Sequence, residues 1–115
     1  IATNTTIERP PTLVGRHRNE TGGLSGRPLF GPSTQVLGEM YRRVGHQISL
    51  IGVGGVSNGR DAYDKIRAGA SLVQVYTALI YQGPGLINRI KRELAGLLRA
   101  DGFASLSEAV GADQR

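Results

Sequence analysis

Two short runs of branched apolar residues place the strongest limit on how this chain folds. They cover residues 48–53 and 72–75, and they do not alternate cleanly with polar residues. A continuous apolar run of this length is typical of a strand buried on both faces, as in a parallel sheet. We therefore expect two buried parallel strands, with residues 1–2 as the end of a third.

The first expected helix precedes the earlier run. Its apolar stripe starts at Val36 and ends at Val44, which is the spacing of one helical face. Ser33 or Thr34 suits the N-cap, and Gly45 suits the position that ends the helix.

Two further helices are expected at residues 60–68 and 84–100. Gly69 suits the left-handed position after the earlier one, while Pro84 suits a first helical turn and Gly102 closes the later helix. The expected inner faces consist of Ala62, Tyr63 and Ile66 in the earlier helix and of Leu86, Ile87, Ile90, Leu94, Leu97 and Leu98 in the later one.

Strands that alternate with helices indicate right-handed crossovers and a parallel sheet. Two strands and a strand end cannot form a complete covered sheet, so we expect part of a larger α/β body, either a barrel or an open sheet. The chain begins at Ile1, inside what looks like a strand. We therefore expect residues 1–115 to be one portion of a single domain that is incomplete at its N-terminus.

Composition narrows the classes of partner. The net charge is +5, but with four Tyr, two Phe and no Trp the chain lacks the stacking platforms of nucleic-acid binding, and we expect no nucleic acid. We also expect no metal site, because the chain has no Cys and neither His17 nor His46 has a neighbour at ligand spacing. No apolar run approaches the ~18 residues of a membrane span, and no signal peptide is visible.

Polar and glycine-rich turns follow both apolar runs. Gly54 and Gly55 follow the first, and Tyr76 and Thr77 follow the second. A lone diglycine favours a simple tight turn. Two consecutive strand ends with exposed amides instead favour a phosphate site, as in the last two loops of a (β/α)8 barrel.

Two more turns carry polar groups near the N-terminus. Ser25 offers a hydroxyl and Gly26 an open amide, although a flexible loop explains them equally well. Asn4 follows the strand end within residues 3–6 and presents donors and an acceptor that suit the edge of a planar heterocycle. A plain turn is an equal alternative there.

Together these motifs resemble a known family. The stretches "ATNTT", "TGGLSGRPL", "IGVGGVSNGRDAYDKIRAGASLVQVYTAL" and "GPGLINRIKRELAGLL" occur in the order found in the C-terminal part of class 2 dihydroorotate dehydrogenases. The resemblance implies about three βα units of an FMN-binding (β/α)8 TIM barrel. It also implies oxidation of dihydroorotate to orotate in de novo pyrimidine biosynthesis, with a quinone as the electron acceptor.

The resemblance also implies roles for individual residues. Thr3 would contact FMN, and Asn4 and Thr5 would bind the orotate ring. Four further residues match positions where the family binds FMN: Gly26, Gly55, Tyr76 and Thr77. We add Ser25 and Gly54 to the expected FMN-binding residues, because they lie in the same turns.

Some features of the family pattern lie upstream of "TNTT". They are the catalytic serine base, a flavin-contacting lysine and a helical segment that meets the membrane. We therefore assign no catalytic residue within this chain, expect it to be inactive alone, and expect the parent enzyme to be peripheral on a bacterial or mitochondrial inner membrane. The alternatives are a fragment of another phosphate-binding barrel or a non-catalytic module that binds a phosphorylated ligand.

Overall fold

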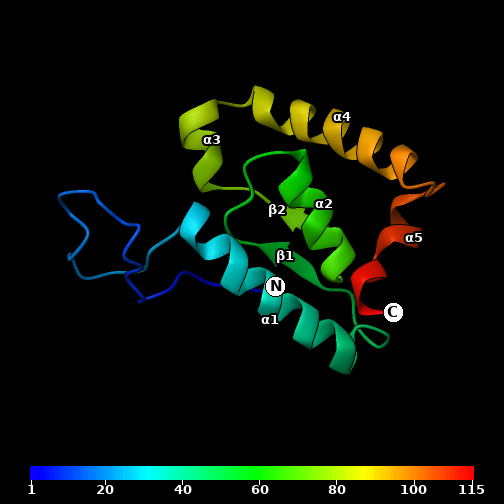
Figure 1. Cartoon of the computed structure of the whole chain (residues 1–115), viewed down its shortest axis with the longest axis horizontal. Helices are drawn as coiled ribbons and strands as arrows, with labels where there is room; N and C mark the ends of the chain where they lie inside the picture. The colour runs from blue at the N-terminus through cyan, green and yellow to red at the C-terminus, as the bar shows by residue number, and fades with distance from the viewer.

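The computed structural model describes residues 1–115, and two short parallel strands lie at its centre (Figure 1). β1 (Ile51–Val53) pairs with β2 (Leu72–Gln74), with Gly52 opposite Val73. Ala2 forms a parallel bridge beside Gly52, and its amide donates to the carbonyl of Ile51 at 2.9 Å. The two parallel strands and the strand end at Ala2 are therefore confirmed, although the first strand begins at Ile51 and not at residue 48.

Helices pack against one face of this small sheet. They are α1 (Phe30–Val44), α2 (Gly59–Ala68), α3 (Thr77–Gln82), α4 (Gly85–Ala100) and α5 (Leu106–Ala109), with 3₁₀ turns at Arg27–Leu29 and Ala112–Gln114. α2 is central, because it packs against α1, α4, α5 and both strands. None of these helices combines the length and the apolar character needed to cross a bilayer.

α2 forms as its sequence predicts. The Asn58 side chain caps its start by accepting from the amide of Asp61 at 2.8 Å, and Gly69 ends it with a φ of 129°. Its expected inner residues are all buried: Ala62, Tyr63 and Ile66. α4 likewise begins beside Pro84 and runs to Ala100, as expected. On its expected inner face Leu86 and Ile90 are buried, but the placement of Ile87 there is wrong, because Ile87 is exposed.

α1 begins earlier than predicted. It starts at Phe30, so Ser33 lies inside the helix, where it is buried, and neither Ser33 nor Thr34 caps it. The chain runs into α1 directly from the preceding 3₁₀ turn, and Pro32 is tolerated because it lies in the first helical turn. The Thr34 hydroxyl instead donates back to the carbonyl of Phe30 at 2.7 Å.

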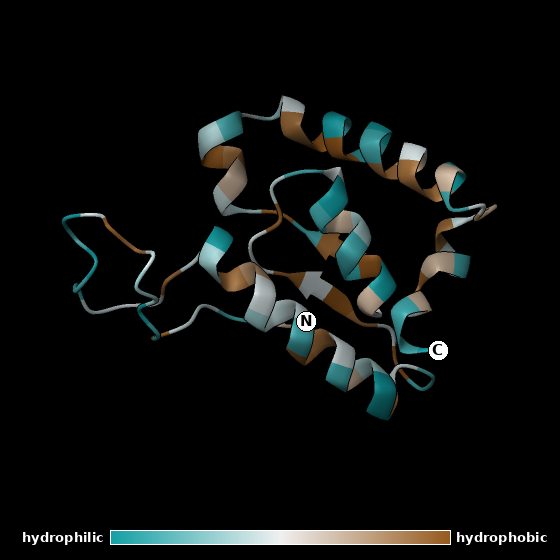
Figure 2. Cartoon of the chain, in the orientation of Figure 1, coloured by the Kyte–Doolittle hydropathy of each residue, from teal (hydrophilic) through white to brown (hydrophobic).

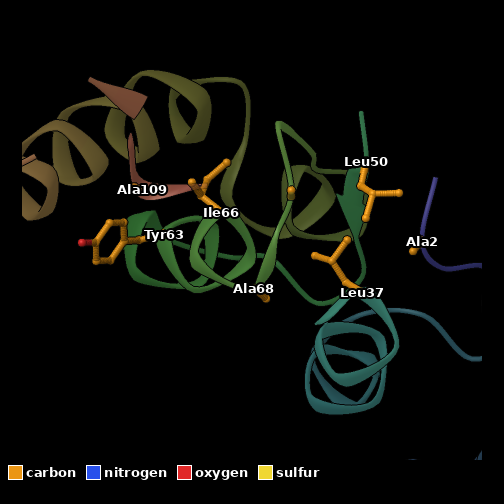
Figure 3. Close-up of a cluster of buried hydrophobic side chains, with 8 residues drawn as sticks. Ala2, Leu37, Leu50, Tyr63, Ile66, Ala68 and Ala109 are labelled. Atoms are coloured by element: carbon orange, nitrogen blue, oxygen red, sulfur yellow. The ribbon is translucent and has the colours of Figure 1, made fainter. Parts of the chain in front are cut away.

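Two apolar clusters hold the helices together. One lies among α1, α2 and the C-terminal tail, and Figure 3 shows several of its side chains: Leu37, Leu50, Tyr63, Ile66 and Ala109. The other joins α2 to α4 through Val56, Ala62, Leu86 and Ile90. Figure 2 shows the matching pattern on α4, whose apolar stripe faces α2 while its polar side faces away.

The prediction that both strands are buried on both faces is wrong. Leu72 is 61% exposed, Gln74 is exposed, and Ile48 ahead of β1 is 53% exposed. The other face, with Gly52 and Val73, packs against the helices. Since right-handed crossovers bring the helices to one side, this chain leaves the opposite face without a cover.

The N-terminal segment makes a long excursion away from the body (blue in Figure 1). An antiparallel bridge closes its base, because the amides of Thr6 and Leu24 each donate to the other residue's carbonyl, at 3.1 and 2.7 Å. Arg9 ties the two sides together by donating to the carbonyls of Glu20 and Gly22 at 2.9 and 2.7 Å.

Candidate functional site

A cavity of about 570 Å³ opens where the strands end. It lies at the carboxyl ends of β1 and β2 and beside the Ala2 bridge, and helical turns form its outer wall. All nine site residues predicted from the sequence line it: Thr3, Asn4, Thr5, Ser25, Gly26, Gly54, Gly55, Tyr76 and Thr77. Four segments that are well separated in the sequence therefore meet at one place.

The diglycine turn after β1 presents unused backbone donors. Gly54 and Gly55 have φ values of 116° and 71°, which residues other than glycine rarely adopt. A Cβ on Gly55 would lie 2.6 Å from the Cβ of Phe30 and 2.7 Å from its backbone nitrogen. The amides of both glycines donate no hydrogen bond within the chain, so they are available to a ligand.

The turn after β2 supplies a second set of donors. The amides of Tyr76 and Thr77 also donate no hydrogen bond within the chain. The Thr77 hydroxyl donates to that of Ser25 at 2.9 Å, and a Cβ on Gly26 would touch the Thr77 methyl at 3.4 Å. This contact holds the N-terminal loop against the end of β2.

Residues 3–5 form a local turn at the cavity edge. The Asn4 side-chain oxygen accepts from the amide of Thr5 at 2.8 Å, and the Thr3 hydroxyl donates to the Asn4 carbonyl at 3.1 Å. The carboxamide NH₂ of Asn4 makes no hydrogen bond to the protein. The turn and the binding interpretations are thus compatible, because one side of Asn4 shapes the loop and the other side is free.

The sequence reasoning missed several polar residues of the cavity. Arg27 donates to the Ser57 hydroxyl at 2.6 Å, and Ser57 donates to Asp61 through its amide and its hydroxyl, at 2.9 and 2.8 Å. Gln74 also lines the cavity. It could have been selected from the sequence, since it is the one polar residue in the run 72–75. Arg27 could also have been selected from the sequence, because it directly follows the predicted site residue Gly26.

The cavity suits an anionic ester attached to a planar group. No Asp or Glu lines it, Arg27 contributes a positive charge, and the free amides of the two turns lie at its wall. Leu29, Val53 and Val75 provide apolar surface beside them. These features fit the phosphate and ring of FMN, because phosphate oxygens accept several backbone hydrogen bonds at once.

The fold and the cavity together define a class of protein. Parallel strands with helices on one face, and a ligand-sized cavity at the carboxyl ends of the strands, are the features of an α/β barrel. This chain is a sector of such a barrel. Its sequence matches the family model of dihydroorotate dehydrogenase over residues 1–98. The chain belongs to the dihydroorotate dehydrogenase family.

Named relatives agree with this assignment. The dihydroorotate dehydrogenase (quinone) of Xanthobacter autotrophicus is 57% identical over 100% of this chain, and the mitochondrial one of Mus musculus is 56% identical over the same share. The matches cover 32% and 29% of those proteins, so the chain spans about a third of their length.

Solved structures confirm the fold. A ligand-free dihydroorotate dehydrogenase from Eimeria tenella superposes with a TM-score of 0.96 at 48% identity, and the match covers 100% of this chain and 32% of that one. The complex of the Eimeria tenella enzyme with ferulenol gives a TM-score of 0.95 at 47% identity, over 99% of this chain and 30% of that one. The predicted family and the predicted partial α/β barrel are both confirmed.

Proposed function

We propose that the protein carrying this chain is a quinone-dependent dihydroorotate dehydrogenase. It oxidises dihydroorotate to orotate with FMN, in the de novo biosynthesis of pyrimidines. One observation carries the proposal: nine residues selected from the sequence, from four separate segments, line a single cavity at the strand ends. Family membership and the activity named for the relatives support it, and they favour it over another phosphate-binding barrel or a non-catalytic module.

We assign the FMN phosphate to the two turns after β1 and β2. The amides of Gly55, Tyr76 and Thr77 have no partner within the chain, so they are free to surround a doubly charged phosphate. Gly54 permits the turn, while Ser25 and Gly26 close the site from the N-terminal loop. Thr3 contacts the flavin at the opposite edge of the cavity.

Asn4 and Thr5 hold the substrate ring in this proposal. The free NH₂ of Asn4 donates to a carbonyl oxygen of the ring, and Thr5 supplies a hydroxyl beside it. Bound FMN supplies the hydride acceptor of the reaction. The contribution of Asn4 and Thr5 is orientation, because hydride transfer requires near-contact geometry between donor and acceptor.

The remaining parts of the proposal concern the whole enzyme. We assign no catalytic base to these 115 residues, and we expect the chain alone to be inactive. Electrons pass to a quinone, since the relatives are named for that acceptor. We place the enzyme peripherally on a bacterial or mitochondrial inner membrane, because quinones are membrane-dissolved.

The test uses the complete polypeptide that carries this chain. We expect it to purify with FMN and to oxidise dihydroorotate with an added quinone. Asn4→Ala should retain FMN but lose dihydroorotate oxidation by about 100-fold, since misplacement by about 1 Å costs that much. Asn88→Ala, on the exposed side of α4, is the matched control and should be unchanged. A flavin-free polypeptide that binds no orotate would contradict the proposal.

A further inference from the structure

A lysine is buried directly behind the diglycine turn. Lys65, on α2, has an exposed fraction of 0%, whereas the only other lysine, Lys91, is exposed on α4. Its ammonium donates to the Ser33 hydroxyl at 2.5 Å and lies 5.0 Å from the centre of the Phe30 ring. No carboxylate forms a salt bridge with it.

Ser33 connects this ammonium to the phosphate turn. The Ser33 hydroxyl has two acceptors within reach, the carbonyl of Phe30 at 3.1 Å and that of Gly54 at 3.4 Å. The carbonyl of Gly54 and the amide of Gly55 belong to the same peptide group. A donor on the carbonyl side polarises the peptide and strengthens its N–H as a donor on the cavity side.

The charge of Lys65 has little local compensation. Asp61, one turn earlier on α2, is the acidic group that acts on it, and Asp61 already accepts from Ser57 and lies 4.0 Å from Arg27. α1 presents the Ser33 hydroxyl and the Phe30 ring, and β1 presents Gly52, so neither element adds a charge. A methionine would fill similar space without the cost of burying a charge. Fold stability alone therefore does not account for a lysine here.

We propose that Lys65 is a positioning residue for phosphate binding, acting through Ser33 on the Gly54–Gly55 peptide and placing a positive charge behind the amide that meets the phosphate. The inference rests on the proposed function, which places the FMN phosphate at this turn. It adds a residue that does not line the cavity and that reaches the ligand only through its neighbours.

Proton uptake on binding follows from this arrangement. Burial lowers the pKa of Lys65 to about 8, against a smaller opposing effect of Asp61. A phosphate ester is doubly ionised at pH 8.5, since its second pKa is about 6. The dianion stabilises the charged lysine, so the pKa of Lys65 rises on binding and the protein takes up a proton.

The test compares FMN with riboflavin, which lacks the phosphate, on the flavin-free complete polypeptide. Affinity is measured by quenching of flavin fluorescence. Proton uptake is measured at pH 8.5 by titration calorimetry in two buffers of different ionisation enthalpy. Lys65→Met should weaken FMN binding by about tenfold, roughly the effect of one net hydrogen bond, and should abolish proton uptake while leaving riboflavin affinity unchanged.

Two further variants sharpen the result. Ser33→Ala should weaken FMN binding in the same direction, and Lys91→Met should match the parent in both measurements. Equal FMN affinity and equal proton uptake in Lys65→Met and the parent would overturn the inference while leaving the proposed function intact. If the parent binds no FMN, the proposed function fails and the inference fails with it. If Lys65→Met does not fold, the test rests on the parent protein, compared with FMN and with riboflavin. Equal proton uptake with the two ligands would then overturn the inference.

Discussion

Replacing Gly55 by alanine tests the geometry of the phosphate turn most directly. Gly55 has a φ of 71°, and an alanine in the left-handed region costs about 1–2 kcal/mol. The added Cβ would also lie 2.6 Å from the Phe30 Cβ and 2.8 Å from its Cα. Because α1 holds Phe30 in place, the neighbour cannot give way freely, and overpacking of this kind costs a further ~1–3 kcal/mol.

The expected total is therefore about 2–5 kcal/mol of lost folding stability. Urea unfolding of the flavin-free complete polypeptide, followed by circular dichroism, measures it. Gly102→Ala is a matched control, because Gly102 has a φ of 79° in the turn that ends α4 but nothing within 4 Å of an added Cβ. That variant should lose only the conformational part, about 1–2 kcal/mol, so the difference between the two isolates the contact with Phe30.

Gly55→Ala should also weaken FMN binding. Any shift that relieves the clash with Phe30 moves the amide of Gly55 away from its ligand, and one net hydrogen bond corresponds to about a tenfold change in affinity. Equal stability losses in Gly55→Ala and Gly102→Ala would refute the reasoning, because they would show that the turn does not press against α1. Unchanged FMN affinity in a destabilised Gly55→Ala would show that the turn does not hold the phosphate.

The remaining predictions concern a buried charge and an uncovered surface. Lys65→Met should raise the free energy of unfolding of the flavin-free protein at pH 7 by up to about 3 kcal/mol, because the pKa of Lys65 falls from 10.5 to about 8 on folding. Between pH 8 and pH 10.5 the folded parent binds fewer protons than the unfolded chain, so the stability of the parent rises with pH. The stability gained by Lys65→Met should therefore shrink over this range. A gain that stays constant would contradict the lowered pKa of Lys65. The isolated 115-residue chain should aggregate or remain loosely packed, since Leu72 and Ile1 are 61% and 76% exposed on and beside the sheet. A sharp thermal transition of a monomeric sample would argue against that expectation.

The parts of the fold that the sequence predicts are those with local signals. α2 has a capping side chain at Asn58, a terminating glycine at Gly69 and a regular apolar stripe, and each acts within a few residues. The cavity could be anticipated because parallel strands end at the same edge, so loops after β1 and β2 have to meet there.

The parts that were missed depend on distant partners. Ser33 looks like a helix cap in the sequence, but its position is fixed by Lys65 and Gly54, 32 and 21 residues away. α3 has only six residues, so its apolar residues, of which Ala78 and Leu79 pack against the second cluster, are too few to show a helical period. The exposure of Leu72 could not be read from its apolar neighbours, because it depends on what covers the sheet rather than on the strand.

The Thr6–Leu24 bridge has a consequence for how this protein can vary. It joins the two ends of the excursion just outside Thr5 and Ser25, and the residues between them do not line the cavity that this chain forms. The entropy of closing such a loop grows only with the logarithm of its length. Insertions or deletions between residues 10 and 19 should therefore be tolerated, and this segment is a suitable place to introduce an affinity tag or a spectroscopic label.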